Sequence, residues 1–405
     1  MVEMSTSSFS SPETSMVDSS MSQNTSSSED AAGTHAKEWK RLFEQMQTHS
    51  SSSSATRTSR IAGPGEASAS NRSSSNRGRG STHAAAISTR GGRNQTTRRL
   101  LDSPGSTSSN LSTTSDPLSR IRHKIVTTPL PPDSSLTPTG TTYRSIVWKL
   151  LLDIRDLDIS SYLSLVAKGR SPSHEKIRND TFRTLATDQG FKERVKEEKL
   201  IRLLDAFVWK FNRGEDSADE AEEVEAGVYE FSYVQGMNVL AAPFLYTLQS
   251  EVEAFRCFSR FIEYCCPLYV QPTLAGLLDR CLELLDPLLY THLRSKNLSA
   301  EIYAFPSVMT LCACTPPLPE VLQLWDFLLA FGVHFNVLCI VAQLHIMRLG
   351  LLESSSPMKL LRNLPALDAR KIINVTVALA RDIPADLFEE LIKHPYHPDS
   401  VVGFT

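Results

Sequence analysis

The stretch LPEVLQLWDFLLAFG, residues 318–332, is largely apolar and carries helix signals at both ends. Pro319 lies near its start and Gly332 at its end. Helices favour this asymmetry, because proline fits the first turn and glycine fits just past the last one. The pattern therefore predicts a helix over 318–332.

The apolar character continues into FLLAFGVHFNVLCIVAQLHIMRLGLL, residues 327–352, the one stretch that could mimic a membrane span. A span needs about 20 predominantly apolar residues in succession. Polar or helix-weakening residues interrupt this stretch, namely Gly332, His334, Asn336, Gln343, His345 and Arg348. We therefore expect two buried helices here and no membrane span.

Helical spacing of apolar residues recurs from about Leu136 onward. In EEKLIRLLDAFVWKF, residues 197–211, the apolar side chains fall on one stripe. SEVEAFRCFSRFIEYC, residues 250–265, begins with a serine cap. Further helical segments are predicted at 141–154, 274–293 (interrupted at Pro287), 356–364, 367–380 and 383–394. Because no window alternates apolar and polar residues for more than a few positions, we predict an all-α fold.

The first 110 residues differ in composition from the rest, since Ser, Thr, Gly, Asn and Arg dominate them. Such a segment cannot bury enough apolar surface to offset the entropy of ordering it. We therefore predict a disordered tail over 1–110, a linker over 111–139, a single multi-helix domain over 140–394 and a C-terminal tail over 395–405.

One island in this tail, THAKEWKRLFEQMQTH, predicts a short amphipathic helix over 35–48. Trp39, Leu42, Phe43 and Met46 follow the i, i+3, i+4, i+7 spacing of one helix face. So short a helix is not stable alone. Two interpretations stay open: the helix folds onto a partner's groove, or it is transient and without a role.

Charge is distributed unevenly around the formal net value of −3. Between residues 56 and 100 there are nine arginines and one acid, and between 215 and 225 there are seven acids and no base. Both runs are typical of solvated, mobile segments. The basic run could instead contact nucleic acid, acidic lipid or an acidic partner. It lacks the interleaved aromatic residues that stack on bases, which argues against a nucleic-acid partner.

The seven cysteines all lie in the apolar part and form no CxxC pair. They are typical of reduced core residues of an intracellular protein. No histidine is placed to complete a metal site, so we expect no metal. Phosphate-binding loops and the common hydrolase, metalloprotease and kinase motifs are absent as well. Any chemistry would therefore come from groups that this chain supplies to another molecule's site.

Two short stretches fit that idea. In IRNDTFRT, residues 177–184, Asp180 and Arg183 are three positions apart and can pair on a helix, with a surface salt bridge as the plain alternative. In FSYVQGMNVLAAPFLY, residues 231–246, an apolar helical stretch carries Gln235, Gly236 and Asn238. Buried amides cost desolvation and glycine weakens a helix, so these residues either satisfy one another in the core or face another molecule.

GTP hydrolysis on a partner GTPase would use both stretches. While water attacks the γ-phosphoryl group in line, an arginine supplied in trans neutralises the developing charge and a glutamine orients the water. An arginine finger accelerates such reactions by about 10³–10⁵-fold. The planar guanidinium suits this role because it stays charged and can reach two oxygens at once.

The motifs resemble those of the TBC-domain (Rab-type) GTPase-activating proteins. IRNDTFRT is similar to the IxxDxxR motif and YVQGMN to the YxQGM motif. Arg144, Trp148, Leu151 and Leu152 match the family's RxxxWxxLL opening, while LPEVLQLWDFLLAFG matches its later Trp-Asp and glycine signature. The order of the motifs is that of the family, across 140 to about 394.

The resemblance implies an all-helical domain that inserts one arginine and one glutamine into the site of a Ras- or Rab-like small GTPase. Arg183 would be the arginine finger and Gln235 the glutamine finger. Asp180, Tyr233, Gly236, Met237 and Asn238 would support the fingers or contact the GTPase; Arg144, Trp148, Ile177, Trp325, Asp326 and Gly332 would be structural. The chain would bind no cofactor of its own, since GTP and magnesium belong to the partner, and would be a GTPase activator rather than an enzyme with its own substrate.

Within the family, the stretch RNDTFRTLATDQGF resembles the corresponding sequence of the fungal GAPs of the mitotic-exit and septation-initiation network. That similarity implies a cytoplasmic protein at the spindle pole body that works with a scaffold subunit as a negative regulator. The alternative is a module that binds a GTPase or scaffold without accelerating hydrolysis. Two departures affect the loops: Ala186 stands where the family usually has proline, and the acidic run 215–225 lengthens the path between the fingers.

Overall fold

The computed structural model describes residues 33–46, 116–212, 232–268 and 274–396. The described residues form helices joined by turns, with one isolated bridge between Leu136 and Thr142 and no strand among them, which confirms the predicted all-α class. The basic run, the acidic run and residues 397–405 lie outside the described residues, as does most of the tail 1–110. The predictions made for them stay predictions.

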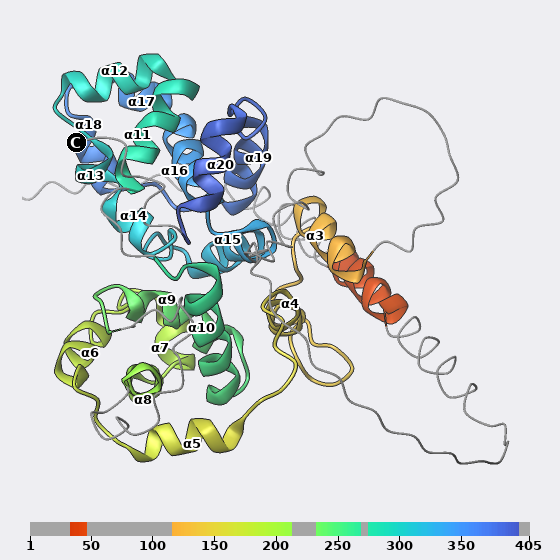
Figure 1. Cartoon of the computed structure of the whole chain (residues 1–405). Helices are drawn as coiled ribbons and strands as arrows, with labels where there is room; N and C mark the ends of the chain where they lie inside the picture. The colour runs from red at the N-terminus through yellow and green to blue at the C-terminus, as the bar shows by residue number, and fades with distance from the viewer. Residues whose placement is uncertain (1–32, 47–115, 213–231, 269–273, 397–405) are drawn as a thin grey trace, which may run out of the picture.

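Figure 1 shows two groups of helices, with α15 between them. The lower group consists of α5 (Ile159–Ala167), α6 (His174–Thr181), α7 (Gln189–Arg194), α8 (Glu197–Phe211), α9 (Met237–Thr247) and α10 (Glu251–Cys265). The upper group consists of α11 (Leu274–Leu285), α12 (Pro287–Ser295), α13 (Ala300–Tyr303), α14 (Phe305–Met309), α16 (Phe335–Ile346), α17 (Arg348–Glu353), α18 (Pro357–Arg362), α19 (Ala369–Leu379) and α20 (Ala385–Lys393). At the side lie α3 (Pro117–Thr127) and α4 (Tyr143–Leu151), and α15 spans Leu318–Phe331.

Helix α8 is the centre of the lower group, where Figure 1 shows it end-on. It packs against α5, α6, α9 and α10. Its stripe of Leu200, Leu203, Leu204 and Phe207 is fully buried, as the spacing predicted. Because α6 and α9 rest on this common support and also contact each other, α8 fixes the position of both finger motifs.

An aromatic cluster joins the lower group to α15. The rings of Trp148 and Trp325 stack with centroids 6.1 Å apart, and Phe244 and Phe261 lie 5.7 Å and 5.4 Å from Trp325. Both tryptophans are essentially inaccessible to solvent. Burying rings of this size is among the largest contributions to a core, so these motif residues belong to the packing of the domain.

Arg144 and Asp326 form an ion pair inside this cluster. The Arg144 Nε donates to both Asp326 carboxylate oxygens at 3.0 Å and 3.2 Å, and its Nη1 donates to Asp133 at 2.9 Å. The Trp148 indole donates to Asp326 at 2.7 Å. Burial raises the pKa of Asp326 against the opposing effects of Arg144 and Trp148, whereas the two carboxylates raise the pKa of Arg144 and keep it charged. Every charged atom thus has a partner where water is excluded.

The two buried helices expected over 327–352 are confirmed, because α15 ends at Phe331 and α16 begins at Phe335. Gly332 turns the chain between them with φ 118° and ψ 147°, a region nearly restricted to glycine. A Cβ at this position would lie 2.5 Å from the His334 ring. Within the described residues, no helix is long and apolar enough to cross a membrane.

The predicted linker 111–139 is wrong for its described part. Residues 117–127 form α3, in which Ile121 and Ile125 are buried, and Leu130 is buried beyond it. The helix packs against α15 and α4. Ser, Thr and Pro at the edges of this segment obscured an isoleucine pair at i, i+4 that forms an ordinary buried helix face.

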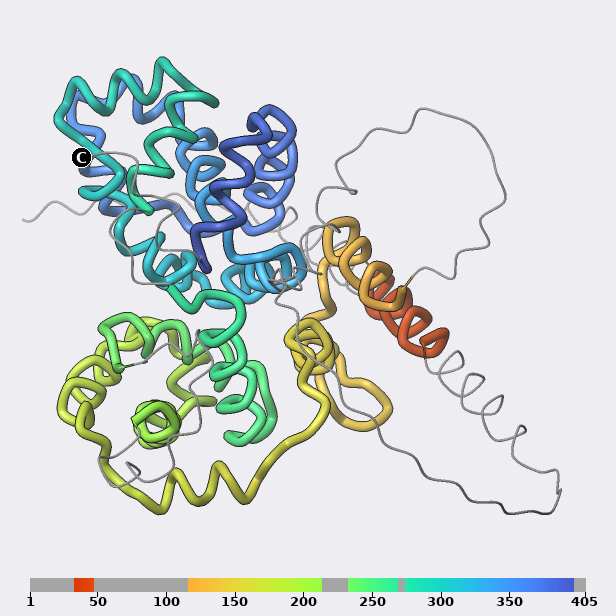
Figure 2. The backbone as a smooth tube through the Cα atoms, viewed as in Figure 1, coloured from red at the N-terminus to blue at the C-terminus, as the bar shows by residue number. Residues whose placement is uncertain are grey.

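The amphipathic helix expected over 35–48 is present over 33–46 and packs on this chain (Figure 2, red beside the orange α3). Trp39 is fully buried and its indole donates to the Pro129 carbonyl at 2.9 Å. Phe43 meets the Tyr143 ring at 5.6 Å, and Glu38 pairs with Lys124. The helix is stabilised by this packing, so within the chain it needs no partner's groove.

All seven cysteines are free thiols, in line with the expected reduced state. Five are buried and Cys265 is half-buried, but Cys314 is exposed and so is not a core residue. Burial raises the pKa of Cys257, Cys281 and Cys339 to about 12, which keeps these thiols protonated and unreactive. In the part of the chain that the structure describes, no group of three or more His, Cys, Asp or Glu side chains could hold a metal.

Candidate functional site

Helix α6 presents Arg183 at its C-terminal end. Ile177, Thr181 and Thr184 face inward at the i, i+4, i+7 spacing and are buried. The helix ends at Thr181, after which the Arg183 amide closes a turn onto the Asp180 carbonyl at 3.1 Å. Arg183 therefore points away from the inward stripe, and 66% of its side chain is exposed.

Gln235 lies in a turn rather than in a helix, so the prediction of a helical stretch from 231 is wrong for its first residues. The chain has no regular structure over 232–234, turns at Gln235 and Gly236, and begins α9 at Met237. Gly236 has φ 106°, which side chains with a Cβ rarely adopt. The glycine thus permits the turn, and Gln235 is exposed at its tip.

A hydrogen-bond network joins these two segments, which are far apart in the sequence. The Tyr233 hydroxyl donates to Asp180 Oδ2 at 2.9 Å. The Asn238 amide donates to the Asp180 carbonyl at 3.2 Å and to Thr184 Oγ1 at 2.8 Å, and its Oδ1 accepts from the Gly236 amide at 3.1 Å. The network fixes the Arg183 turn against the Gln235 turn.

Three of the expected site residues around the Gln235 turn are buried and so are not surface contacts. Tyr233, Met237 and Asn238 are 6%, 2% and 5% exposed. Of the two side-chain amides in this stretch, that of Asn238 has its hydrogen-bond partners inside the domain, whereas that of Gln235 is exposed. Thr184 was missing from the expected site residues; the signal was its place directly after Arg183, where a short hydroxyl can bond back to Asp180.

The described residues hold the Arg183 guanidinium only loosely. Its Nη2 donates to Asp180 Oδ1 at 3.3 Å, while the other carboxylate oxygen of Asp180 is taken by Tyr233. Because the guanidinium is largely solvated, exchanging this long bond for one to another molecule costs little, and the Asp180 carboxylate, 13% exposed, keeps Tyr233 as a partner. Asp180 therefore orients Arg183 and leaves it free to reach another molecule.

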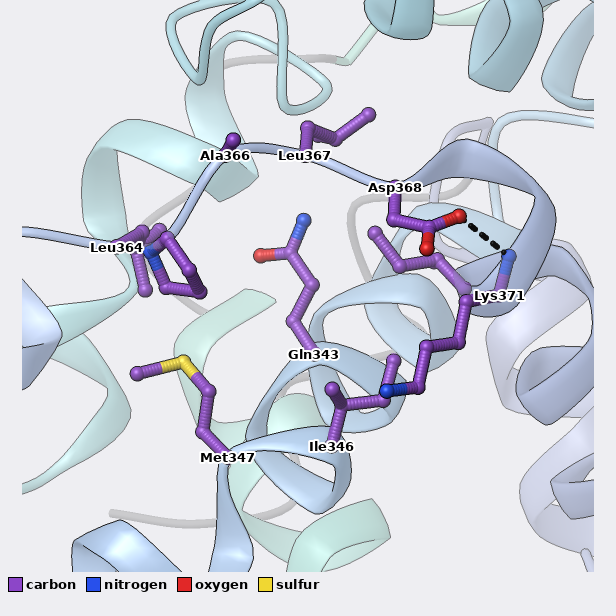
Figure 3. A pocket seen from close by; sticks show the side chains of 10 residues that line it. Gln343, Ile346, Met347, Leu364, Ala366, Leu367, Asp368 and Lys371 are labelled. Carbon is purple, nitrogen blue, oxygen red and sulfur yellow. Dashed lines mark hydrogen bonds between the residues drawn. The ribbon is translucent and has the colours of Figure 1, made fainter. Parts of the chain in front are cut away.

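A cavity of about 220 Å³ lies apart from these turns, beside α16 and α19 (Figure 3). Ile346, Met347 and Leu364 line it, and the Gln343 amide points into it with no partner for its buried nitrogen. A water molecule in a cavity of this size would satisfy that amide. Because none of the expected site residues lines this cavity, the exposed turns remain the candidate site.

The Rab-GTPase-TBC domain family matches residues 141–352 of this chain. The chain is similar to "Cell division control protein 16" of Schizosaccharomyces pombe, with 42% identity over 71% of this chain and 90% of that protein. It is 38% identical to "Mitotic check point protein BUB2" of Saccharomyces cerevisiae, over 70% of this chain and 93% of that protein. A Dictyostelium discoideum protein, "Putative mitotic check point protein BUB2", is 40% identical over 62% of this chain and 65% of its own length.

The family match covers both finger turns and the buried Arg144–Asp326 pair, and the two fungal relatives align over most of their own length. The resemblance to the fungal cell-division group is therefore confirmed together with the wider one. The chain belongs to the Rab-GTPase-TBC domain family and is a GTPase activator.

Proposed function

We propose that this chain accelerates GTP hydrolysis by a Ras- or Rab-like small GTPase through Arg183 and Gln235, which it inserts into the partner's active site. The observation that supports the proposal is the network of Asp180, Tyr233 and Asn238. It fixes two exposed side chains of the required types on neighbouring turns while leaving both without a tight partner in the described part of the chain.

The division of labour follows from the chemistry of phosphoryl transfer. GTP and its magnesium stay on the GTPase, so this chain needs no cofactor and catalyses no reaction on a substrate of its own. Arg183 neutralises charge that develops on the γ-phosphoryl oxygens, and Gln235 orients the attacking water. Since both groups act in the transition state, they raise the rate of hydrolysis more than the affinity for the GTPase.

The cellular role that we propose is negative control of mitotic exit and septation, together with a scaffold subunit at the spindle pole body in the cytoplasm. Its support is the similarity to relatives named for cell division and for the mitotic checkpoint.

The test is single-turnover hydrolysis of GTP by a panel of purified Ras- and Rab-type GTPases with the full-length chain in excess. We expect strong acceleration of at least one GTPase by the wild type. Arg183→Ala and Gln235→Ala should each lose most of it while still binding that GTPase. A non-catalytic binding module would instead bind a GTPase and accelerate none of them.

A further inference from the structure

An aromatic side chain beside the arginine finger has no role in the fold. Phe182 is 75% exposed, the highest value among the large hydrophobic side chains that the structure describes. In the described part of the chain it packs neither into the hydrophobic core nor against another ring. An exposed phenylalanine is costly in water and gives the domain no stability in return.

The position of Phe182 follows from the geometry of α6. Ile177, Thr181 and Thr184 occupy the inward face, and Phe182 caps the helix on the side turned away from them. Its Cα lies about 3.8 Å from that of Arg183, as it must for neighbouring residues. A protein surface that covers the Arg183 turn would therefore also lie close to the Phe182 side chain.

We propose that Phe182 is an affinity- and specificity-determining contact that packs against an apolar patch on the partner GTPase beside its nucleotide pocket. The inference rests on the function proposed above and adds to it a requirement on the partner's surface. Aromatic residues that become fully buried at an interface are frequent anchors of binding energy. Phe182 would bind the GTPase equally well before and during hydrolysis, whereas Arg183 acts on the transition state.

This difference predicts that substitution of Phe182 changes mainly KM, whereas substitution of Arg183 changes mainly kcat. With the GTPase that the wild type accelerates most, Phe182→Ala in the full-length chain should raise KM for the GTP-loaded GTPase about tenfold and keep kcat within about twofold. Arg183→Ala should show the reverse, with kcat reduced and KM nearly unchanged. Phe182→Leu, which keeps an apolar side chain, should recover most of the lost affinity.

Leu349→Ala is the matched control, because Leu349 is 70% exposed on α17 in the other group of helices. It should change neither KM nor kcat, and none of these variants should change the free energy of unfolding. Binding of the GTPase loaded with a non-hydrolysable GTP analogue gives a readout independent of catalysis, and Phe182→Ala should weaken it about tenfold.

The outcomes separate the two proposals. If the wild type accelerates no GTPase, the proposed function fails and this inference fails with it. If the wild type is active and Phe182→Ala matches it in KM and in analogue binding, only this inference is overturned. A loss of kcat at unchanged KM would likewise contradict it, since that result would place Phe182 in the catalytic step.

Discussion

Two arginine–aspartate pairs of this chain differ in almost every physical respect. Arg144 binds both oxygens of Asp326, is almost fully buried and has Asp133 as a second carboxylate partner. Arg183 makes one bond of 3.3 Å to Asp180 and is 66% exposed. Each guanidinium nitrogen of Arg144 has a carboxylate partner, whereas in the described part of the chain only Nη2 of Arg183 has one.

The difference shows that the same type of ion pair, arginine with aspartate, can either hold the fold together or keep a side chain available to another molecule. A buried charge must be fully paired because an unpaired one costs several kcal/mol, so Arg144 cannot leave Asp326 without destabilising the domain. The Arg183 guanidinium is largely solvated and makes one long bond to Asp180, so it can exchange that carboxylate for another acceptor at little cost. We infer that Arg144 holds the fold and that Arg183 is held ready for a partner.

The largest effect is expected when Arg183 is replaced by lysine, which keeps the charge and removes the planar guanidinium. We expect GTP hydrolysis in the presence of the variant to be slower by about 10³-fold, because an ammonium cannot contact two oxygens in one plane. Single-turnover kinetics measures this rate. Retention of the wild-type rate would show that charge alone suffices and that Arg183 has no two-pronged role.

Arg144→Ala should have its effect on stability instead. Removing the guanidinium leaves Asp326 buried without its cation, and we expect the free energy of unfolding to fall by about 3–5 kcal/mol. Urea denaturation followed by circular dichroism measures it. Arg183→Ala is the control and should unfold at the wild-type urea concentration; equal destabilisation by both variants would remove the distinction.

Asn238→Ala tests whether the placement of Arg183 and Asp180 depends on the buried hydrogen-bond network behind them. The variant loses the amide that bonds to Thr184 and to the Asp180 carbonyl, so we expect about 1–3 kcal/mol of destabilisation. Because the Gln235 turn is then less well placed, hydrolysis should slow by about ten- to a hundredfold. Asn363→Ala removes an exposed amide at the C-cap of α18, whose side chain donates to the Lys359 carbonyl, and should change the rate not at all and the stability little. An Asn238→Ala chain with the wild-type rate would show that the network does not position Arg183 and Gln235.

The smallest effect concerns a buried ionisable group without a charged partner. Burial lowers the pKa of His334 to about 3, and that of the neighbouring His394 to about 4. Both values lie below that of the unfolded chain, about 6.5, so the unfolded state binds more protons as the pH falls. The free energy of unfolding is therefore unaffected by these two histidines above about pH 6.5, and it falls progressively as the pH is lowered toward 3.

For His334 alone, the free energy of unfolding at pH 5.5 should be about 1 kcal/mol lower than at neutral pH. Urea unfolding of the wild type and of His334→Phe across pH 7.5 to 5 measures it. We expect the wild type to lose stability more steeply than the variant. Parallel slopes would contradict this, since they would mean that folding does not lower the pKa of His334.

The sequence was sufficient for elements whose apolar spacing is regular. The helix predicted over 197–211 has those bounds in the structure, and Pro287 separates α11 from α12 as expected. It was insufficient for segments whose order depends on contacts with distant parts of the chain. The spacing around Trp39 predicted a helix but not what covers it: the Trp39 indole bonds to Pro129, and Phe43 packs against Tyr143, ninety or more positions away.

The motifs indicated Arg183 and Gln235 as candidate fingers, but they did not indicate the hydrogen-bond network that joins the two turns. Spacing indicated that Asp180 can pair with Arg183. It could not indicate that Asp180 also accepts from Tyr233, or that Asn238 bonds back to Thr184, because these contacts arise only when α6 and α9 pack side by side. The turn at Gly236 likewise depends on a backbone conformation that a pattern of apolar residues does not reveal.

The most direct test measures GTP hydrolysis and unfolding on the same preparations of the wild type, Arg183→Ala and Arg144→Ala. We predict that Arg183→Ala keeps the wild-type free energy of unfolding and loses about 10³-fold in the accelerated rate. Arg144→Ala should lose stability and, at a temperature where it is still folded, retain the acceleration. A folded Arg183→Ala chain that accelerates hydrolysis as the wild type does would contradict the account.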